Sequence, residues 1–192
     1  MPTEPGATLI PIARAAISAA LGRPQVAATD AAWLQEPGAT FVTLTQRGQL
    51  RGCIGTLQAH RSVLEDVQAN AVAAATRDPR FSQLVAEELG DTRIEVSLLS
   101  QMQPLEFASE SEALVQLRPG IDGVLLEFGR HRSTFLPQVW EQLPDRREFM
   151  AQLKQKAGLP ANFWADGMRL QRYTVAKWKE PELPQATHTE TP

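Results

Sequence analysis

Leu50-Arg51-Gly52-Cys53-Ile54-Gly55 is the stretch that decides the fold. It holds the only cysteine in a chain of 192 residues. The preceding run, residues 41–45, reads Phe-Val-Thr-Leu-Thr and is rich in the β-branched and aromatic residues that favour strands. Arg47-Gly48 has the chemistry of a tight turn, and the apolar pattern resumes at Leu50. The sequence therefore predicts a β-hairpin whose second strand carries this stretch.

Side-chain alternation along that strand puts Arg51 and Cys53 on one face and Leu50 and Ile54 on the other. At ~3.3 Å per residue, the first two lie roughly 7 Å apart, and a guanidinium near a thiol favours the reactive thiolate. The flanking glycines would let a ligand approach the backbone closely. From the residues alone the unreactive reading is the more common one, because free cysteine usually packs as a small apolar residue and strand glycines often mark only tight packing.

The stretch resembles the hexapeptide signature of the AMMECR domain family, also called AmmeMemoRadiSam system protein A. Further blocks resemble the family in the same order and extend the similarity over roughly residues 9–178. These blocks are residues 70–75 with 78–81, residues 94–100 (Ile-Glu-Val-Ser-Leu-Leu-Ser), residues 135–139 (Phe-Leu-Pro-Gln-Val) and residues 156–159 (Lys-Ala-Gly-Leu).

The expected fold is α+β, with a curved, mostly antiparallel sheet and packed helices in a larger and a smaller lobe. The resemblance implies that the signature lines a cleft between the lobes. In bacteria and archaea it also implies a pathway shared with a Memo-like protein and a radical SAM protein. We expect one AMMECR-type domain over residues 1–178 and a disordered tail over residues 179–192, because the tail is rich in proline and poor in apolar residues.

Composition excludes several classes of protein. Hydrophobic content of 43% and charged content of 21% are typical of a globular domain. A net charge of −3 argues against a broad nucleic-acid interface. A single cysteine excludes an internal disulfide and a multi-cysteine cluster, so radical SAM chemistry, which needs three cysteines, cannot lie in this chain. Without a membrane-length apolar run or a secretory leader pattern, we expect a cytoplasmic protein.

Two helices are predicted in the first half. Residues 8–21 have apolar side chains at helical spacing, with Pro11 expected in the first turn, where an amide hydrogen has no helical partner. Ser62 and Glu65 form a capping-box pattern that starts a second helix. Asn70 stands one position from the apolar stripe of that helix, so both a buried polar role and a solvent-facing one stay open.

A rigid turn and a strand follow. Asp78-Pro79-Arg80 breaks the helix, because the residue before proline avoids the α region. The turn is either a surface ion pair or an anion or partner contact beside the hairpin. Residues 92–100 alternate as a strand, with Glu95 and Ser97 on the polar face. We predict that Glu95 pairs with Arg51 or with Arg80; a solvated outer face is the alternative reading.

The second half contains further predicted elements: helices over residues 109–117, 137–143 and 145–157, a hairpin over residues 124–128 and 133–136, and a strand region over residues 168–178.

No nucleotide-binding or hydrolase motif is present, and the three histidines (His60, His131 and His188) are scattered, so catalytic residues stay unassigned. We expect no metal site and no cofactor, and the sequence leaves open whether the chain is an enzyme. Two functions remain: a catalytic or substrate-binding component with a polar cleft for an anionic substrate, or a non-catalytic interaction module. The candidate site residues are Arg51, Gly52, Cys53, Gly55, Asn70, Asp78, Arg80, Glu95 and Ser97.

Overall fold

The computed structural model describes residues 4–181 and has an α+β fold with two antiparallel sheets, which confirms the predicted fold class. These residues form two compact units, residues 4–98 with 177–181, and residues 99–176. The antiparallel strands are divided between two sheets rather than joined in one.

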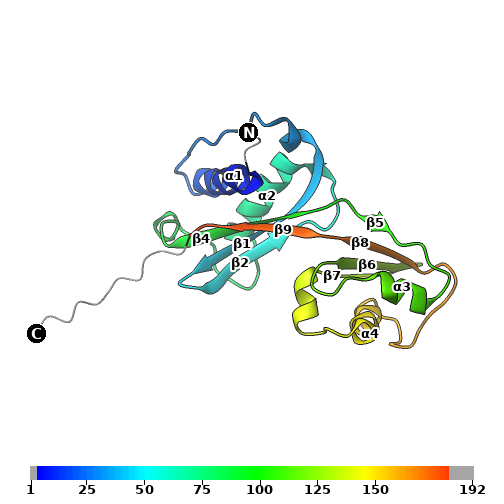
Figure 1. Cartoon of the computed structure of the whole chain (residues 1–192). Helices are drawn as coiled ribbons and strands as arrows, with labels where there is room; N and C mark the ends of the chain where they lie inside the picture. Colours follow the sequence, from blue (N-terminus) through cyan, green and yellow to red (C-terminus); the bar gives the residue numbers. More distant parts are fainter. Residues whose placement is uncertain (1–3, 182–192) are drawn as a thin grey trace, which may run out of the picture. The chain divides into compact units, whose positions relative to one another are not determined.

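The first unit contains a five-stranded sheet in the order β2-β1-β4-β9, with β3 paired to β1, and two helices on the same side of it (Figure 1). Its elements are α1 (Pro5–Ala20), the 3₁₀ helix η1 (Ala32–Gln35), β1 (Pro37–Gln46), β2 (Gln49–Gly55), β3 (Arg61–Ser62), α2 (Val63–Thr76), the 3₁₀ helix η2 (Ala86–Glu88), β4 (Thr92–Leu99) and β9 (Val175–Lys179).

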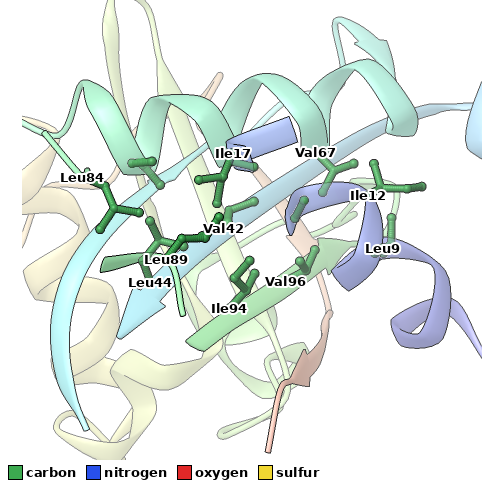
Figure 2. Close-up of a cluster of buried hydrophobic side chains, with 14 of the residues drawn as sticks. Leu9, Ile12, Ile17, Val42, Leu44, Val67, Leu84, Leu89, Ile94 and Val96 are labelled. Carbon is green, nitrogen blue, oxygen red and sulfur yellow. The ribbon is translucent and has the colours of Figure 1, made fainter. Parts of the chain in front are cut away.

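The core of this unit lies between the helices and the sheet. Figure 2 shows side chains of α1 and α2 meeting those of β1 and β4. Ile17 and Val67 reach the core from the two helices, while Val42, Ile94 and Val96 reach it from the strands, and all five are fully buried. The alternation that predicted β4 therefore places its apolar face against the helices.

Helix α1 starts earlier than predicted, with Pro5 in its first turn, and Pro11 lies inside it rather than in the first turn. That prediction was wrong about the start of the helix. Pro11 is solvent-exposed, so the carbonyl that it leaves without a helical donor can be hydrated. Helix α2 begins as predicted, with Ser62 and Glu65 forming a capping box.

The second unit has a sheet in the order β5-β8-β6-β7, with α3 and α4 on one side of it (Figure 1). Ser109 and Asp145 cap α3 and α4, which begin where the helices over residues 109–117 and 145–157 were predicted. Trp140 stacks on Phe149 at 3.7 Å between ring centroids and anchors the core. The elements are β5 (Gln103–Pro104), α3 (Glu110–Gln116), β6 (Gly123–Phe128), β7 (His131–Phe135), the 3₁₀ helix η3 (Pro137–Glu141), α4 (Arg146–Lys156) and β8 (Arg169–Tyr173).

The start of the predicted tail is ordered. Lys179 ends β9, and the Glu180 N–H donates to the Ile94 carbonyl at 3.0 Å. Lys179 and Glu180 therefore belong to the ordered unit, and the predicted start of the tail at residue 179 is corrected. The Glu180 carboxylate accepts from Arg14 and from the Ile94 N–H, contacts that the composition of the segment does not reveal. The rest of the predicted tail, residues 182–192, lies outside the described residues.

Candidate functional site

The signature occupies β2, the second strand of the predicted hairpin, and Arg47 and Gly48 form the turn with φ of 50° and 76°. The pairing contains a bulge: Thr45 pairs with Leu50 and Leu44 with Gly52, so Arg51 has no partner residue. Strict alternation therefore fails at Arg51.

The bulge changes which side chains share a face. Paired residues of antiparallel strands lie on one face, so Cys53, opposite Thr43, and Leu50, opposite Thr45, share a face. Ile54, opposite Val42, points into the core. The prediction that Leu50 and Ile54 share a face was wrong, because the extra residue at the bulge moves the side chain of Leu50 to the opposite face.

The two glycines of the signature serve internal packing. A Cβ on Gly52 would lie 2.2 Å from the Ala74 carbonyl oxygen, so glycine lets α2 approach the strand. A Cβ on Gly55 would lie 2.2 Å from the ring of Phe41, its cross-strand partner. Ala74 and Phe41 already occupy the space beside the two glycines. The prediction that Gly52 and Gly55 let a ligand approach the backbone therefore has no support.

Arg51 holds the segment that follows α2. Its guanidinium donates to the Ser82 carbonyl at 2.7 Å and to the Glu88 carboxylate at 3.1 Å. The Val85 N–H and then Arg51 lower the pKa of Glu88, although burial opposes them. The predicted Arg51–Glu95 pair was therefore wrong: the partner is Glu88, which the turn after α2 brings to the strand.

Asp78 and Arg80 form a clasp on the backbone of Cys53. The Cys53 N–H donates to Asp78 Oδ2 at 2.9 Å, and Arg80 Nη2 donates to the Cys53 carbonyl at 3.3 Å. Arg80 also donates from Nε and Nη2 to the two carboxylate oxygens of Asp78, at 3.0 and 2.7 Å. We call these three residues the Cys53 clasp. It occupies backbone groups on an edge strand that would otherwise be free to pair with another strand.

The electrostatics of the clasp follow from this geometry. The Arg80 guanidinium, followed by the N–H groups of Cys53 and Arg80, holds the pKa of Asp78 far below its usual range, against the opposing effect of burial. Asp78 raises the pKa of Arg80, and the nearby thiol of Cys53 adds a smaller Coulombic contribution in the same direction. The guanidinium that contacts Cys53 is therefore that of Arg80, which donates to the Cys53 carbonyl, whereas Arg51 donates to Ser82 and Glu88.

The thiol itself is half-buried, and its Sγ lies 3.2 Å from the hydroxyl of Thr43 on β1. The side chain of Asp78 is 2% exposed, whereas that of Arg80 is 54% exposed. The clasp thus presents one accessible cation and one partly accessible thiol.

A buried polar network that sequence reasoning missed lies beneath α2. The carboxylate of Asp66, which is fully buried, accepts bonds from the Thr40 N–H at 2.7 Å, the Thr56 hydroxyl at 2.8 Å and Arg61 Nε at 2.9 Å. Asn70 donates to Asp66 at 2.9 Å and to the Thr40 carbonyl at 2.9 Å. Asn70 is therefore a buried polar residue, one of the two roles left open. Asn70 follows Asp66 by four residues, about one helical turn, and this spacing was the sequence signal that could have predicted the contact between the two side chains.

The remaining candidates do not join the clasp. Glu95 is half-buried and Ser97 is buried, and among residues 4–181 neither side chain has a hydrogen-bond partner. His131 Nδ1 lies 2.9 Å from the Ala157 carbonyl at the end of α4, and His188 lies outside the described residues. No group of three or more metal-ligating side chains occurs within the part of the chain that the structure describes. In that same part, no helix has the length and apolar character needed to cross a membrane.

Comparison with known proteins identifies the family. The AMMECR1 family model matches residues 10–178. A protein of Methanothermobacter thermautotrophicus is 38% identical over 168 residues, which is 85% of this chain and 87% of the relative. A protein of Aeropyrum pernix is 38% identical over 160 residues, which is 78% of this chain and 67% of the relative.

A solved structure agrees with these sequence matches. The crystal structure of an uncharacterised protein from Pyrococcus horikoshii superposes with a TM-score of 0.77 at 30% identity, covering 92% of each chain. The resemblance read from the ordered sequence blocks is therefore confirmed. The chain belongs to the AMMECR1 family.

Proposed function

We propose that the chain is a catalytic or substrate-binding component that acts at the Cys53 clasp and binds an anionic substrate there. The supporting observation is the half-exposed Arg80 guanidinium, which two bonds to Asp78 and one to the Cys53 carbonyl hold against the signature strand. Arg80 Nη1 has no hydrogen-bond partner among residues 4–181 and is the group that would meet the anion.

The clasp is suited to orienting a ligand. A guanidinium locked by a buried carboxylate loses little side-chain freedom when it binds, so it presents its free N–H groups in a defined direction. Because Asp78 offsets its charge, specificity for the anion comes from directed hydrogen bonds more than from excess positive potential. The hydroxyl of Thr43 and the thiol of Cys53 add polar contacts on the same side.

The pathway is part of the proposal. We infer from the family resemblance that this chain acts in the cytoplasm with a Memo-like protein and a radical SAM protein. A chain with one cysteine cannot supply the three ligands of a radical SAM cluster. The radical chemistry would therefore belong to the partner, and this chain would bind or process the anionic compound that the pathway shares.

The test is alkylation of Cys53 by iodoacetamide over a pH series on folded protein, with and without inorganic phosphate as the anion probe. We expect labelling of the folded protein near neutral pH, slower labelling of Arg80→Ala, and protection of the wild-type thiol by phosphate. Arg130→Ala, which removes an exposed arginine of the second unit, serves as the control and should label like wild type. Labelling that occurs only after denaturation, or that ignores phosphate, would overturn the proposal.

A non-catalytic interaction module is the second candidate. Arg51, Gly52 and Gly55 favour this function, because all three are engaged in contacts within the unit. Much of the signature is therefore not free to contact a ligand. Co-elution of the chain with the purified Memo-like protein of the same organism, unchanged by Cys53→Ala and Arg80→Ala, together with no effect of phosphate on labelling, would favour this function.

A further inference from the structure

The sulfur of Cys53 has a single hydrogen-bond contact among residues 4–181, and it is with a hydroxyl. Cys53 Sγ lies 3.2 Å from Thr43 Oγ1 on the neighbouring strand β1. The clasp contacts only backbone atoms of Cys53, because Asp78 accepts from its N–H and Arg80 donates to its carbonyl. A threonine, rather than an arginine, is therefore the polar group that meets the sulfur.

The pairing of β1 with β2 explains why these two side chains meet. Thr43 and Cys53 are partner residues in the antiparallel register. Because the N–H and the carbonyl of Cys53 point away from β1 toward the clasp, this is a non-hydrogen-bonded pair, the kind in which Cα atoms approach to ~4.5 Å and side chains lie closer. The backbone orientation that serves the clasp therefore also brings the hydroxyl to the thiol.

The pair lies on the face of the sheet opposite the helices. Val42 and Leu44, the neighbours of Thr43, are fully buried in the core, so the side chain of Thr43 points to the other face. Helices α1 and α2 both lie on the core side (Figure 1). Thr43 and Cys53 are each half-buried, so the sulfur is not sealed in the core.

We propose that Thr43 is a positioning residue for the Cys53 thiol, whose hydroxyl donates to the sulfur, favours the thiolate and fixes its direction. In the neutral pair either atom can donate, but a thiolate has no proton and can only accept. The Thr43 hydroxyl has no other hydrogen-bond partner in the described part of the chain, so it is available as the donor. Since a bond to an ionised acceptor is the stronger one, the contact stabilises the thiolate more than the thiol. This inference deepens the proposed function and rests on it.

The test is the pH dependence of the rate at which iodoacetamide labels the folded protein. After the thiol proton passes to solvent, the sulfur attacks the methylene carbon and iodide leaves with the electron pair of the C–I bond, so the rate follows the ionised fraction. Thr43→Val keeps a branched side chain that strands favour and removes the donor. We expect the pH of half-maximal labelling to rise by about 0.5 unit or more. The limiting rate at alkaline pH should not fall, because a thiolate that loses a donor is more nucleophilic.

Three further variants make the test specific. Thr43→Ser returns the hydroxyl and should restore the wild-type midpoint, whereas Thr43→Ala should behave like Thr43→Val. Thr45→Val is the matched control, because Thr45 lies on the same strand and face but is paired with Leu50 and makes no hydrogen bond with the sulfur. An unchanged midpoint in Thr43→Val and Thr43→Ala, an equal shift in Thr45→Val, or no restoration by Thr43→Ser would each overturn the inference.

Inorganic phosphate separates this inference from the proposed function. Protection of the wild-type thiol by phosphate tests the anion site at Arg80, whereas the midpoint of the pH profile tests Thr43. Protection together with an unchanged midpoint in Thr43→Val would overturn the role of Thr43 alone. A shifted midpoint without protection would support the bond between Thr43 and Cys53 and overturn the proposed function.

Discussion

The carboxylate of Asp78 accepts a hydrogen bond from the backbone N–H of Cys53 at 2.9 Å, across 25 residues of sequence. This bond ties the turn after α2 to the signature strand, and Arg80 of the same turn donates to the Cys53 carbonyl at 3.3 Å. The stability and the chemistry of the signature therefore depend on a residue outside it.

Asp78 should make the protein sensitive to acid. Its folded pKa lies below the unfolded value of about 4, so the stability that it contributes is fully present above pH ~4 and is lost as pH falls below that value. Asp78→Asn should be less stable at neutral pH, by about 1–3 kcal/mol, and should lose less stability than wild type on acidification. Urea unfolding at several pH values measures both effects. Parallel pH profiles for variant and wild type would contradict the assignment.

The network around Asp66 should be the most costly polar feature to disrupt. Asp66→Ala leaves the buried Thr40 N–H and the buried Asn70 amide without their acceptor, so we expect a loss of about 1–3 kcal/mol for each of these two groups. Glu95→Ala, which removes a half-buried carboxylate without a partner in the described chain, is the matched control. Chemical denaturation should separate the two variants, and equal losses would show that the network contributes little.

The signature glycines should differ in their tolerance of a methyl group. Gly52→Ala would push a Cβ against the carbonyl of Ala74, a rigid backbone atom, and should cost about 1–3 kcal/mol or more. Gly55→Ala meets the Phe41 ring, a side chain that can rotate away, and should cost less. Gly90→Ala has open space and should be neutral or slightly stabilising. Thermal unfolding ranks the three, and a neutral Gly52→Ala would refute the packing role.

The partner of Arg51 can be identified by double-mutant cycles. Arg51→Ala should lower stability by about 1–3 kcal/mol, because it releases the 82–88 segment and leaves Glu88 without its guanidinium. The cycle with Glu88→Ala should give a coupling energy of about 0.5 kcal/mol or more, and the cycle with Glu95→Ala should give about zero. Coupling to Glu95 instead would restore the pairing expected from alternation.

The end of β9 should matter more than its composition suggests. Glu180 accepts from Arg14 Nε at 2.8 Å and from the Ile94 N–H at 2.9 Å, so Glu180→Ala should cost about 1–3 kcal/mol. A chain ending at Trp178 should lose at least as much, whereas a chain ending at Pro181 should keep the stability of the full chain. Equal midpoints for the two truncations would show that Glu180 does not hold the strand.

Local rules account for what could be predicted. The hairpin turn at Arg47-Gly48, the capping box of Ser62 and Glu65, and the alternation of β4 each involve residues within a few positions of one another. Propensity, capping and periodicity act over that range, so the sequence by itself determined these elements, and the ordered blocks determined the family.

Only the tertiary structure decided the site. The contacts that define it join Cys53 to Asp78 across 25 residues, Thr40 to Asp66 across 26 and Arg51 to Glu88 across 37. Strict alternation along β2 failed because the bulge at Arg51 arises from pairing with β1, which no local pattern in the strand encodes. Which guanidinium contacts Cys53 was therefore settled by how the turn after α2 folds back onto the edge of the sheet.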